Sequence, residues 1–376
     1  MAAVLCLQPE PVRKHHRMSI WKYADSITPI DVTNRITLGE GQTPLVRSRK
    51  IGPEAGLQNL YFKLEGTNPT GSFKDRFAAA AVSHMLQIGK SECIATSSGN
   101  TGAALAAYSA AAGIRCRIVI AESVPIGKVS QMLAYGADVC RVKEFGLDPD
   151  IDRRVFRFLK RLSGQPGRAL LVSAYVFSPE GMRGVETLGI ELAEQLEGLQ
   201  HVFCPAGGGG MCVGVSRGFA TLGRDDRLHC CPAVHCVQPE GNDTISTRLR
   251  EGGERATDVE STSGISGLQV SRVVDGHLTI EACRLTGGTG YTVTDEHVWN
   301  VQKRLAREEG IFTEPAGAVA LAGVLKAAAS GELPREATTA CIVSGIGFKD
   351  TVAVDRINSD VECPAIDPAA LESEIA

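Results

Sequence analysis

Several features that would indicate a membrane, nucleic-acid-binding or secreted protein are missing from this sequence. No run of about 18 apolar residues occurs, so no transmembrane helix is predicted. The 39 Lys and Arg nearly balance the 43 Asp and Glu, so no excess charge draws the chain toward nucleic acid or an anionic membrane. The N-terminal apolar run lacks the preceding positive region of a secretory signal. We therefore expect a cytoplasmic protein with no nucleic-acid or membrane partner.

The cysteines lack the paired spacing of metal-binding motifs. There are 12 of them, and no CxxC pair occurs. The densest group runs from His229 to Cys236 and is typical of a buried apolar strand or, alternatively, of a zinc site. Because paired ligands at finger-like spacing are missing, we favour the strand and predict no metal. In the absence of a secretory signal, reduced thiols are expected.

Glycine, in contrast, is abundant, with 41 residues, many in short clusters. A chain of 376 residues suggests two domains at about 100–200 residues each. Residues 1–35 look like an irregular arm, 250–263 like a surface loop, and 361–376 like a loose tail.

Short apolar segments alternate with helical stretches, which predicts βαβ units and parallel sheets covered by helices on both faces. The predicted strands are 60–64, 92–96, 117–121, 139–142, 170–172, 201–204, 235–237 and 340–343. The predicted helices are 77–88, 102–112, 129–135, 184–196, 295–309 and 316–329.

Two Gly-containing junctions in the first third of the chain carry polar groups at helix starts. In the segment 68–76 (NPTGSFKDR), Lys74 comes just before an Ala-rich helix. The helix dipole and burial would both favour its neutral amine, although a solvated lysine is the alternative. The segment 97–102 (SSGNTG) suits a carboxylate ligand or an ordinary helix cap.

Two further junctions follow predicted strands later in the chain, where ligands of open α/β sheets bind. Four successive glycines, Gly207–Gly210, leave the backbone bare before a helix and predict a phosphate site, with a flexible hinge as the alternative. They match neither a dinucleotide fingerprint nor a Walker loop. Ser344 follows the last strand, where it could meet a ring nitrogen or belong to a tight turn.

In this order, the four motifs resemble the fold type II pyridoxal-5′-phosphate (PLP) enzymes, over roughly residues 20–355. The resemblance implies an α/β protein of two domains, each with a mostly parallel twisted sheet flanked by helices, with PLP in the cleft between them. We expect residues 51–180 to form the smaller domain, with Lys74 and the 97–102 loop. Residues 1–50 and 181–376 would form the larger domain, with Gly207–Gly210 and Ser344.

The resemblance also implies roles for single residues. Lys74 would hold PLP as a Schiff base and act as general base, with Phe73 packed on the ring. Asn100 would hydrogen-bond the phenolic oxygen, Gly207–Gly210 would hold the phosphate, and Ser344 would face the pyridine nitrogen. Ser98 would be a second catalytic acid. The substrate-binding candidates are Ser97, Ser98, Gly99, Thr101 and Arg183.

Among these enzymes, the segments 21–23, 39–45, 68–76 and 344–350 look most like threonine synthase. Phe77, the tetraglycine and the 177–183 segment depart from it, and Arg183 is displaced from the position of the arginine that binds substrate phosphate. Gln238 stands where serine racemase has a metal-ligand glutamate.

The best expectation is a PLP-dependent carbon–oxygen lyase that converts O-phosphohomoserine to threonine. A serine/threonine dehydratase, a cysteate synthase-like replacement enzyme and a non-catalytic PLP-fold regulator are the alternatives. We also expect a small amino-acid substrate and a homodimer.

Overall fold

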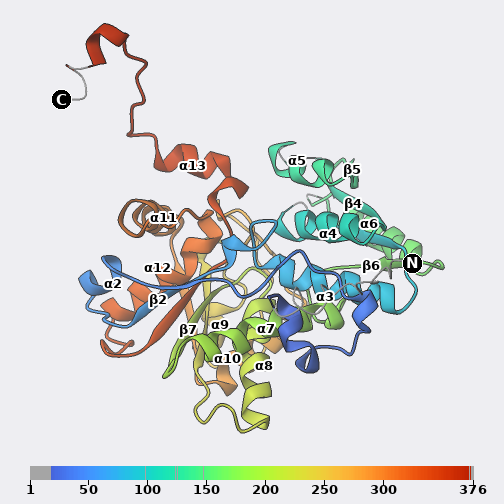
Figure 1. Cartoon of the computed structure of the whole chain (residues 1–376), viewed down its shortest axis with the longest axis horizontal. Helices are drawn as coiled ribbons and strands as arrows, with labels where there is room; N and C mark the ends of the chain where they lie inside the picture. Colours follow the sequence, from blue (N-terminus) through green and yellow to red (C-terminus); the bar gives the residue numbers. More distant parts are fainter. Residues whose placement is uncertain are drawn as a thin grey trace, which may run out of the picture.

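The computed structural model describes residues 18–97, 99–122, 124, 126–146, 148–371 and 373. Two sheets lie side by side along the long axis of the molecule, each flanked by helices (Figure 1). The six-stranded sheet is parallel apart from the antiparallel pairing of its first two strands. Its strands, in spatial order, are β1 (Leu45–Arg47), β2 (Leu60–Leu64), β10 (Thr339–Val343), β7 (His201–Pro205), β8 (Ala233–Pro239) and β9 (Gly290–Val293).

The four-stranded sheet is parallel throughout. Its order is β5 (Asp138–Val142), β4 (Arg115–Ala121), β3 (Glu92–Ala95) and β6 (Arg168–Leu170). All of its strands lie inside the segment 51–180 that was predicted for the smaller domain. Strand β2 also falls inside that segment, but it pairs into the six-stranded sheet. The chain therefore enters the four-stranded sheet only after β2, later than the predicted boundary at residue 51.

Most helices lie between the strands, as the alternating sequence predicted. They are α2 (Ile51–Glu54), α3 (Lys74–Gln87), α4 (Asn100–Ala111), α5 (Ile126–Ala134), α6 (Pro149–Ser163), α7 (Pro179–Gln195), α8 (Gly210–Arg224), α9 (Ser246–Arg250), α10 (Gly276–Leu285), α11 (Asp295–Glu309), α12 (Pro315–Ala329) and α13 (Thr351–Ile357). Short 3-10 helices span Ile20–Ser26, Val32–Asn34, Glu65–Thr67, Glu240–Asn242, Gly347–Lys349 and Pro368–Ala370.

Helix boundaries follow local chemistry. The Thr294 side chain accepts a hydrogen bond from the His297 N–H at the start of α11, and Gly310, with φ +70°, ends that helix. Pro315 occupies the first turn of α12, where its missing N–H costs nothing.

Strand β10 is buried on both faces because helices cover both sides of its sheet. Ala340 and Ile342 pack in a core with side chains of α7, α8 and α10. Cys341 and Val343 point the opposite way, into a core with α11 and α12. This period-two alternation places the carboxyl end of β10, and hence Ser344, in the middle of the molecule.

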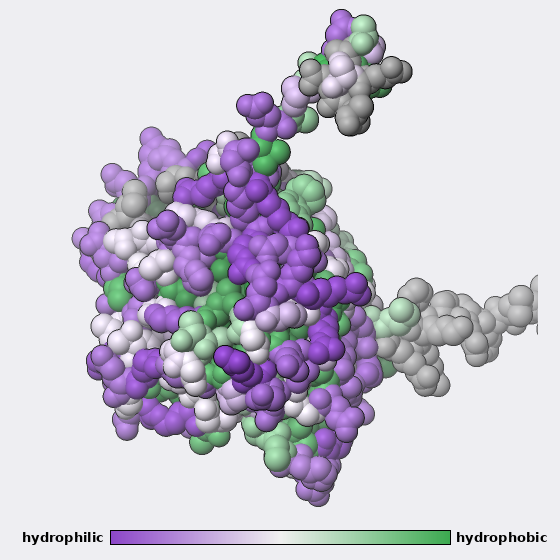
Figure 2. Space-filling view, turned by 90° about the vertical axis from the view of Figure 1, so that its left-hand side faces the viewer, coloured by the Kyte–Doolittle hydropathy of each residue, from purple (hydrophilic) through white to green (hydrophobic). Residues whose placement is uncertain are grey.

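The surface is largely hydrophilic on the face shown in Figure 2, where hydrophobic residues appear in small groups. The segment after α13 runs away from the body of the protein (Figures 1 and 2), as the predicted tail suggested. No helix in the described part of the chain is long and apolar enough to cross a membrane.

Candidate active site

The predicted junctions meet at one cleft, of about 1430 Å³, between the two sheets. They converge because the 96–101 segment follows β3, the tetraglycine follows β7, and Ser344 follows β10, all at carboxyl ends of parallel strands. The predicted site residues that line it are Phe73, Lys74, Ser97, Gly99, Asn100, Thr101, Gly207, Gly208, Gly209, Gly210 and Ser344. Ser98 lies outside the described residues.

Lys74 is the first residue of α3, and its amine has few partners. Nζ donates a hydrogen bond to Ser173 Oγ at 2.8 Å and lies 4.6 Å from the centroid of the Phe73 ring. No carboxylate of the described residues forms an ion pair with it. Burial lowers the pKa of Lys74 to about 8, against the opposing effect of the Glu314 charge. A substantial fraction of neutral amine near neutral pH suits a nucleophile for carbonyl chemistry.

The turn that carries Lys74 is tied to the end of β10. The Phe73 N–H donates to the Ser344 carbonyl at 3.0 Å, and Ser72 pairs with Gly345 as an isolated bridge. Gly71 has φ +89°, and a Cβ there would come within 2.7 Å of the Ile346 side chain. The lysine and serine sides of the cleft are therefore held in a fixed relation.

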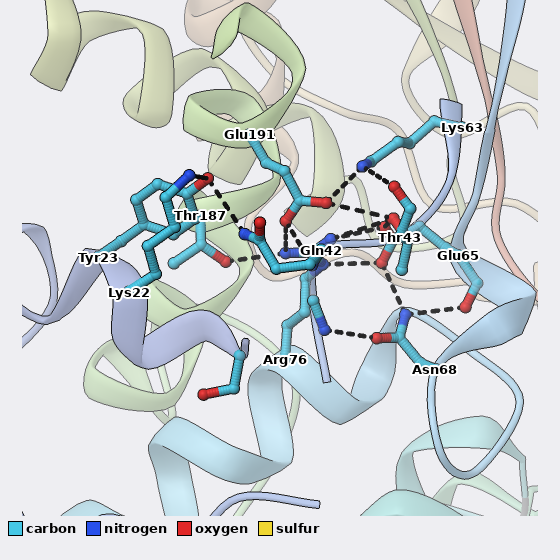
Figure 3. Close-up of polar contacts among 12 residues, drawn as sticks. Lys22, Tyr23, Gln42, Thr43, Lys63, Glu65, Asn68, Arg76, Thr187 and Glu191 are labelled. Atoms are coloured by element: carbon cyan, nitrogen blue, oxygen red, sulfur yellow. Dashed lines mark hydrogen bonds and ion pairs between the residues drawn. The ribbon is translucent and has the colours of Figure 1, made fainter. Parts of the chain in front are cut away.

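Asp75 and Arg76, which follow Lys74, are structural. The Asp75 carboxylate accepts hydrogen bonds from the backbone N–H and the hydroxyl of Thr70, which closes the turn. Arg76, fully buried, bridges Glu65 and Glu191 at 2.7 and 2.9 Å (Figure 3). It thereby joins α3 to α7 and to the segment after β2.

Lys63 completes this buried ion-pair network and also contacts Glu191 (Figure 3). Although burial alone would raise the pKa of Glu191, Arg76 and Lys63 lower it to about 2. Two cations thus balance the carboxylates of Glu65 and Glu191, and the network has no spare charge for a ligand.

The tetraglycine loop has the shape of an anion cradle. Gly209 has φ +82°, and a Cβ there would lie 2.1 Å from Thr279 Oγ1, so a side chain is excluded. A Cβ on Gly208 would instead meet nothing within 4 Å, since this position opens on the cleft. Helix α8 begins at Gly210, so the positive end of its dipole lies at the loop. A phosphate group fits this combination.

Gln238 supports the loop from behind. Its side chain is fully buried and donates to the Gly207 carbonyl at 3.3 Å and to Thr244 Oγ1 at 2.9 Å. Its amide oxygen accepts from the N–H groups of Ile245 and Ser246. The amide is satisfied within the protein.

Asn100 lies across the cleft at the start of α4, and its Nδ2 donates to Glu314 Oε1 at 2.7 Å. Ser344 is 4% exposed, and its hydroxyl has no hydrogen-bond partner among the described residues. A donor amide and a hydroxyl on the lining of the Lys74 cleft are the groups that a PLP ring requires at its phenolic oxygen and ring nitrogen. The donor set therefore fits the cofactor.

The polar residues of the cleft wall that sequence reasoning missed include Gln131, Ser173, Glu314 and Lys349. Glu314 precedes Pro315 at the start of α12, and this helix start was the only available signal. Lys349 donates to Gln131 Oε1 at 2.6 Å and so links the segment after β10 to α5.

Arg183 is the predicted residue that the structure does not bring to the site. It lies on α7 and is absent from the residues that line the cleft in the described chain. Its charge instead acts on Glu186 of the same helix.

The cleft and its donors agree with the comparisons with known proteins. The family profile described as "Pyridoxal-phosphate dependent enzyme" matches residues 36–345, and the chain belongs to this family. PLP is its cofactor, and it is an enzyme with a lyase-type reaction.

Two of the proteins that resemble this chain in sequence are threonine synthases. The chain is 35% identical to threonine synthase of Methanosarcina acetivorans over 89% of this chain and 81% of the relative. Threonine synthase of Methanocaldococcus jannaschii is 32% identical, with 94% and 87% covered. Among solved structures, the processed threonine deaminase isoform 2 of Solanum lycopersicum superposes with a TM-score of 0.72 at 22% identity, covering 92% of this chain and 94% of that one. The last similarity concerns the fold alone.

Proposed function

We propose that the protein is a threonine synthase, which converts O-phosphohomoserine and water to L-threonine and inorganic phosphate. The observation that carries this proposal is the identity of 29–35% with threonine synthases along nearly the whole chain. The geometry of the Lys74 side of the cleft supports it, because it provides a lysine of lowered pKa beside a phosphate cradle.

Each side chain has a defined task in this proposal. PLP supplies an electron sink for charge that develops at the substrate's Cα. Lys74 would be the residue that holds PLP, and its free amine would take the proton from the substrate's Cα. The polar start of α4, with Ser97, Gly99 and Thr101, receives the substrate carboxylate. Ser344 offers a neutral partner to the ring nitrogen, which favours elimination over transamination.

The charges around the cleft favour a second candidate, a serine/threonine dehydratase. A bound phosphate dianion needs strong, charge-assisted donors. The cationic residues of the lining, Lys74, Arg153, Arg272 and Lys349, are matched by Asp152, Asp258, Glu260 and Glu314. Arg153 and Arg272 are mostly exposed and lie near Asp150 and Asp258.

Two polar side chains of the 177–183 segment have other contacts or lie outside the cleft lining. Ser178 Oγ accepts from the Val172 N–H at 3.1 Å, and Arg183 lies off the cleft. Among the described residues that line the cleft, Lys349 is then the partly buried cation left for a substrate phosphate. A dehydratase substrate, serine or threonine, would need no such group.

One assay separates the two candidates. Purified holoenzyme receives O-phosphohomoserine and, separately, L-threonine and L-serine. Phosphate and threonine formed in equal amounts from the first support the synthase. Oxo acid and ammonia from the other two, with no phosphate released from the first, would overturn it in favour of the dehydratase. The replacement reaction, the homodimer and the cytoplasmic location stay predictions.

A further inference from the structure

A buried carboxylate stands directly behind the amide that is assigned to the cofactor's phenolic oxygen. Glu314 is 4% exposed, and its Oε1 accepts a hydrogen bond from Asn100 Nδ2 at 2.7 Å. The two residues come from distant parts of the chain, since Asn100 begins α4 and Glu314 precedes α12. The contact therefore joins the helix after β3 to the helix beside β10.

The surrounding backbone is built around this carboxylate. A Cβ on Gly345 would lie 2.2 Å from Glu314 Oε1 and 3.4 Å from Asn100 Nδ2, so only glycine leaves room for the pair. The Glu314 N–H donates to the Gly345 carbonyl at 3.2 Å, and its carbonyl accepts from the Gly317 N–H at 3.0 Å. The backbone of Glu314 is therefore held at both its N–H and its carbonyl.

This contact determines how the Asn100 amide is oriented. A carboxylate can only accept hydrogen bonds, so the NH₂ end of the amide must face Glu314. One N–H is used there, and the second stays available on the cleft side. A flipped amide would present oxygen to the carboxylate, and two acceptors would then oppose each other.

We propose that Glu314 is a positioning residue for PLP: it holds the Asn100 amide with its second N–H free for the phenolic oxygen, and its negative charge acts on the Lys74 amine. The proposal rests on the assignment of Lys74 and Asn100 to the cofactor. It is independent of which amino acid the enzyme converts.

The electrostatic part follows from the groups around Lys74. Burial lowers the pKa of Lys74, and the Glu314 charge opposes that shift. Among the described residues, Lys349, on the segment after β10, and Asp75, on α3, are charged groups close to this pair. Glu314 and Asp75 also oppose the effect of burial on Lys349. Removing the charge of Glu314 alone should lower the pKa of Lys74 further.

A double-mutant cycle tests the positioning role through PLP affinity. Glu314→Ala should raise the PLP dissociation constant roughly tenfold, the effect of one charge-assisted hydrogen bond. In an Asn100→Ala background the same substitution should have a much smaller effect, because the hydrogen bond is already lost and only the action of the Glu314 charge on Lys74 remains. An equal loss in both backgrounds would overturn the positioning role. Thermal unfolding of each apoprotein shows that the variants are folded.

The pH dependence of cofactor addition tests the electrostatic role. The rate at which apoprotein combines with PLP follows the neutral fraction of Lys74. Glu314→Gln keeps a hydrogen-bond acceptor and removes the charge, so the midpoint should move to lower pH by about one unit. Glu186→Gln, a buried carboxylate on α7, should leave it unchanged. An identical midpoint in Glu314→Gln and wild type would contradict the proposal.

A wrong assignment of Lys74 to the cofactor would give a different experimental result. If Lys74→Ala still forms the covalent adduct, the choice of lysine is wrong, and the Glu314 experiments then report on another amine. Because no substrate is used, neither result depends on whether the enzyme is a synthase or a dehydratase.

Discussion

Two lysines close together in the chain show how differently one side chain can be used. Lys63, on β2, is completely buried, and its ammonium contacts Glu191 and, at 2.7 Å, the Thr43 carbonyl (Figure 3). It also donates to the Gln195 amide oxygen at 2.7 Å. Lys74 opens on the cleft and has only the Ser173 hydroxyl as a hydrogen-bond acceptor among the described residues.

The difference lies in the partners rather than in burial. An ammonium has three N–H donors, and Lys63 finds an acceptor for each. Burial lowers the pKa of Lys63 as well, but the charges of Glu191 and Glu65 oppose this shift. Lys74 loses hydration without equivalent compensation, which lowers its pKa to about 8. We infer that Lys74 is reactive because its amine has too few hydrogen-bond acceptors around it. Lys63, whose three donors all have acceptors, is structural.

The largest effect should follow from removing the reactive lysine. Lys74→Ala should abolish covalent PLP attachment and lower turnover by about 10²–10⁴-fold or more, the contribution of a general base. Borohydride reduction of the holoenzyme followed by peptide mapping checks the site of attachment. Lys63→Met is the matched control and should keep the label on Lys74. A pyridoxyl group on any other lysine of the wild type would refute the assignment.

The structural lysine should show the opposite behaviour. Lys63→Met breaks a buried network and leaves Glu191 short of a partner, so it should lower the free energy of unfolding by about 3–5 kcal/mol. Lys303→Met removes an exposed pair with Asp360 and should cost about 0–1 kcal/mol. Urea unfolding of the three proteins at neutral pH makes the comparison. Equal stability of Lys63→Met and wild type would show that the network contributes nothing net.

Much of the fold could be predicted because the buried strands are short apolar segments between helices. All eight predicted strands are present, with small shifts at their ends. Strands β1 and β9 were not predicted, because neither has a strong apolar pattern. Strand β1 has only three residues at a sheet edge, and β9 begins with Gly290. Helix α6 was missed although Asp148 and Pro149 mark its start, and this signal was in the sequence.

The site was predictable wherever a motif directly follows a strand, as at Asn100, Gly207–Gly210 and Ser344. Glu314 could not be found in this way, because its role depends on a contact with a residue far away in the sequence. Lys63 looks like an ordinary strand residue, and only packing shows that it is buried. Arg183 was chosen by its position in the segment, and it is absent from the lining of the cleft in the described chain.

The tetraglycine loop extends the comparison to a site where we propose that backbone N–H groups alone hold a charged group. Gly208→Val should fill the open space above the loop and cost PLP hydrogen bonds worth about 1.5–3 kcal/mol each. Equilibrium titration of apoprotein with PLP measures the loss. Gly223→Ala, in α8 with no atom near its would-be Cβ, should leave affinity unchanged and slightly increase stability. An unchanged dissociation constant in Gly208→Val would count against the loop.

The smallest effect is expected at Ser344, where a neutral hydroxyl stands in place of a charged partner. Ser344→Ala removes one ordinary hydrogen bond to the ring nitrogen, so PLP affinity should fall by only about 0.5–1.5 kcal/mol. Ser344→Asp introduces the charge that the wild type avoids, and it should protonate the ring and shift the product ratio away from elimination. Absorption spectra of the bound cofactor and product analysis follow the two changes. If Ser344→Asp has the same spectrum and product ratio as wild type, Ser344 does not face the ring nitrogen, and the uncharged partner there has no part in the choice of reaction.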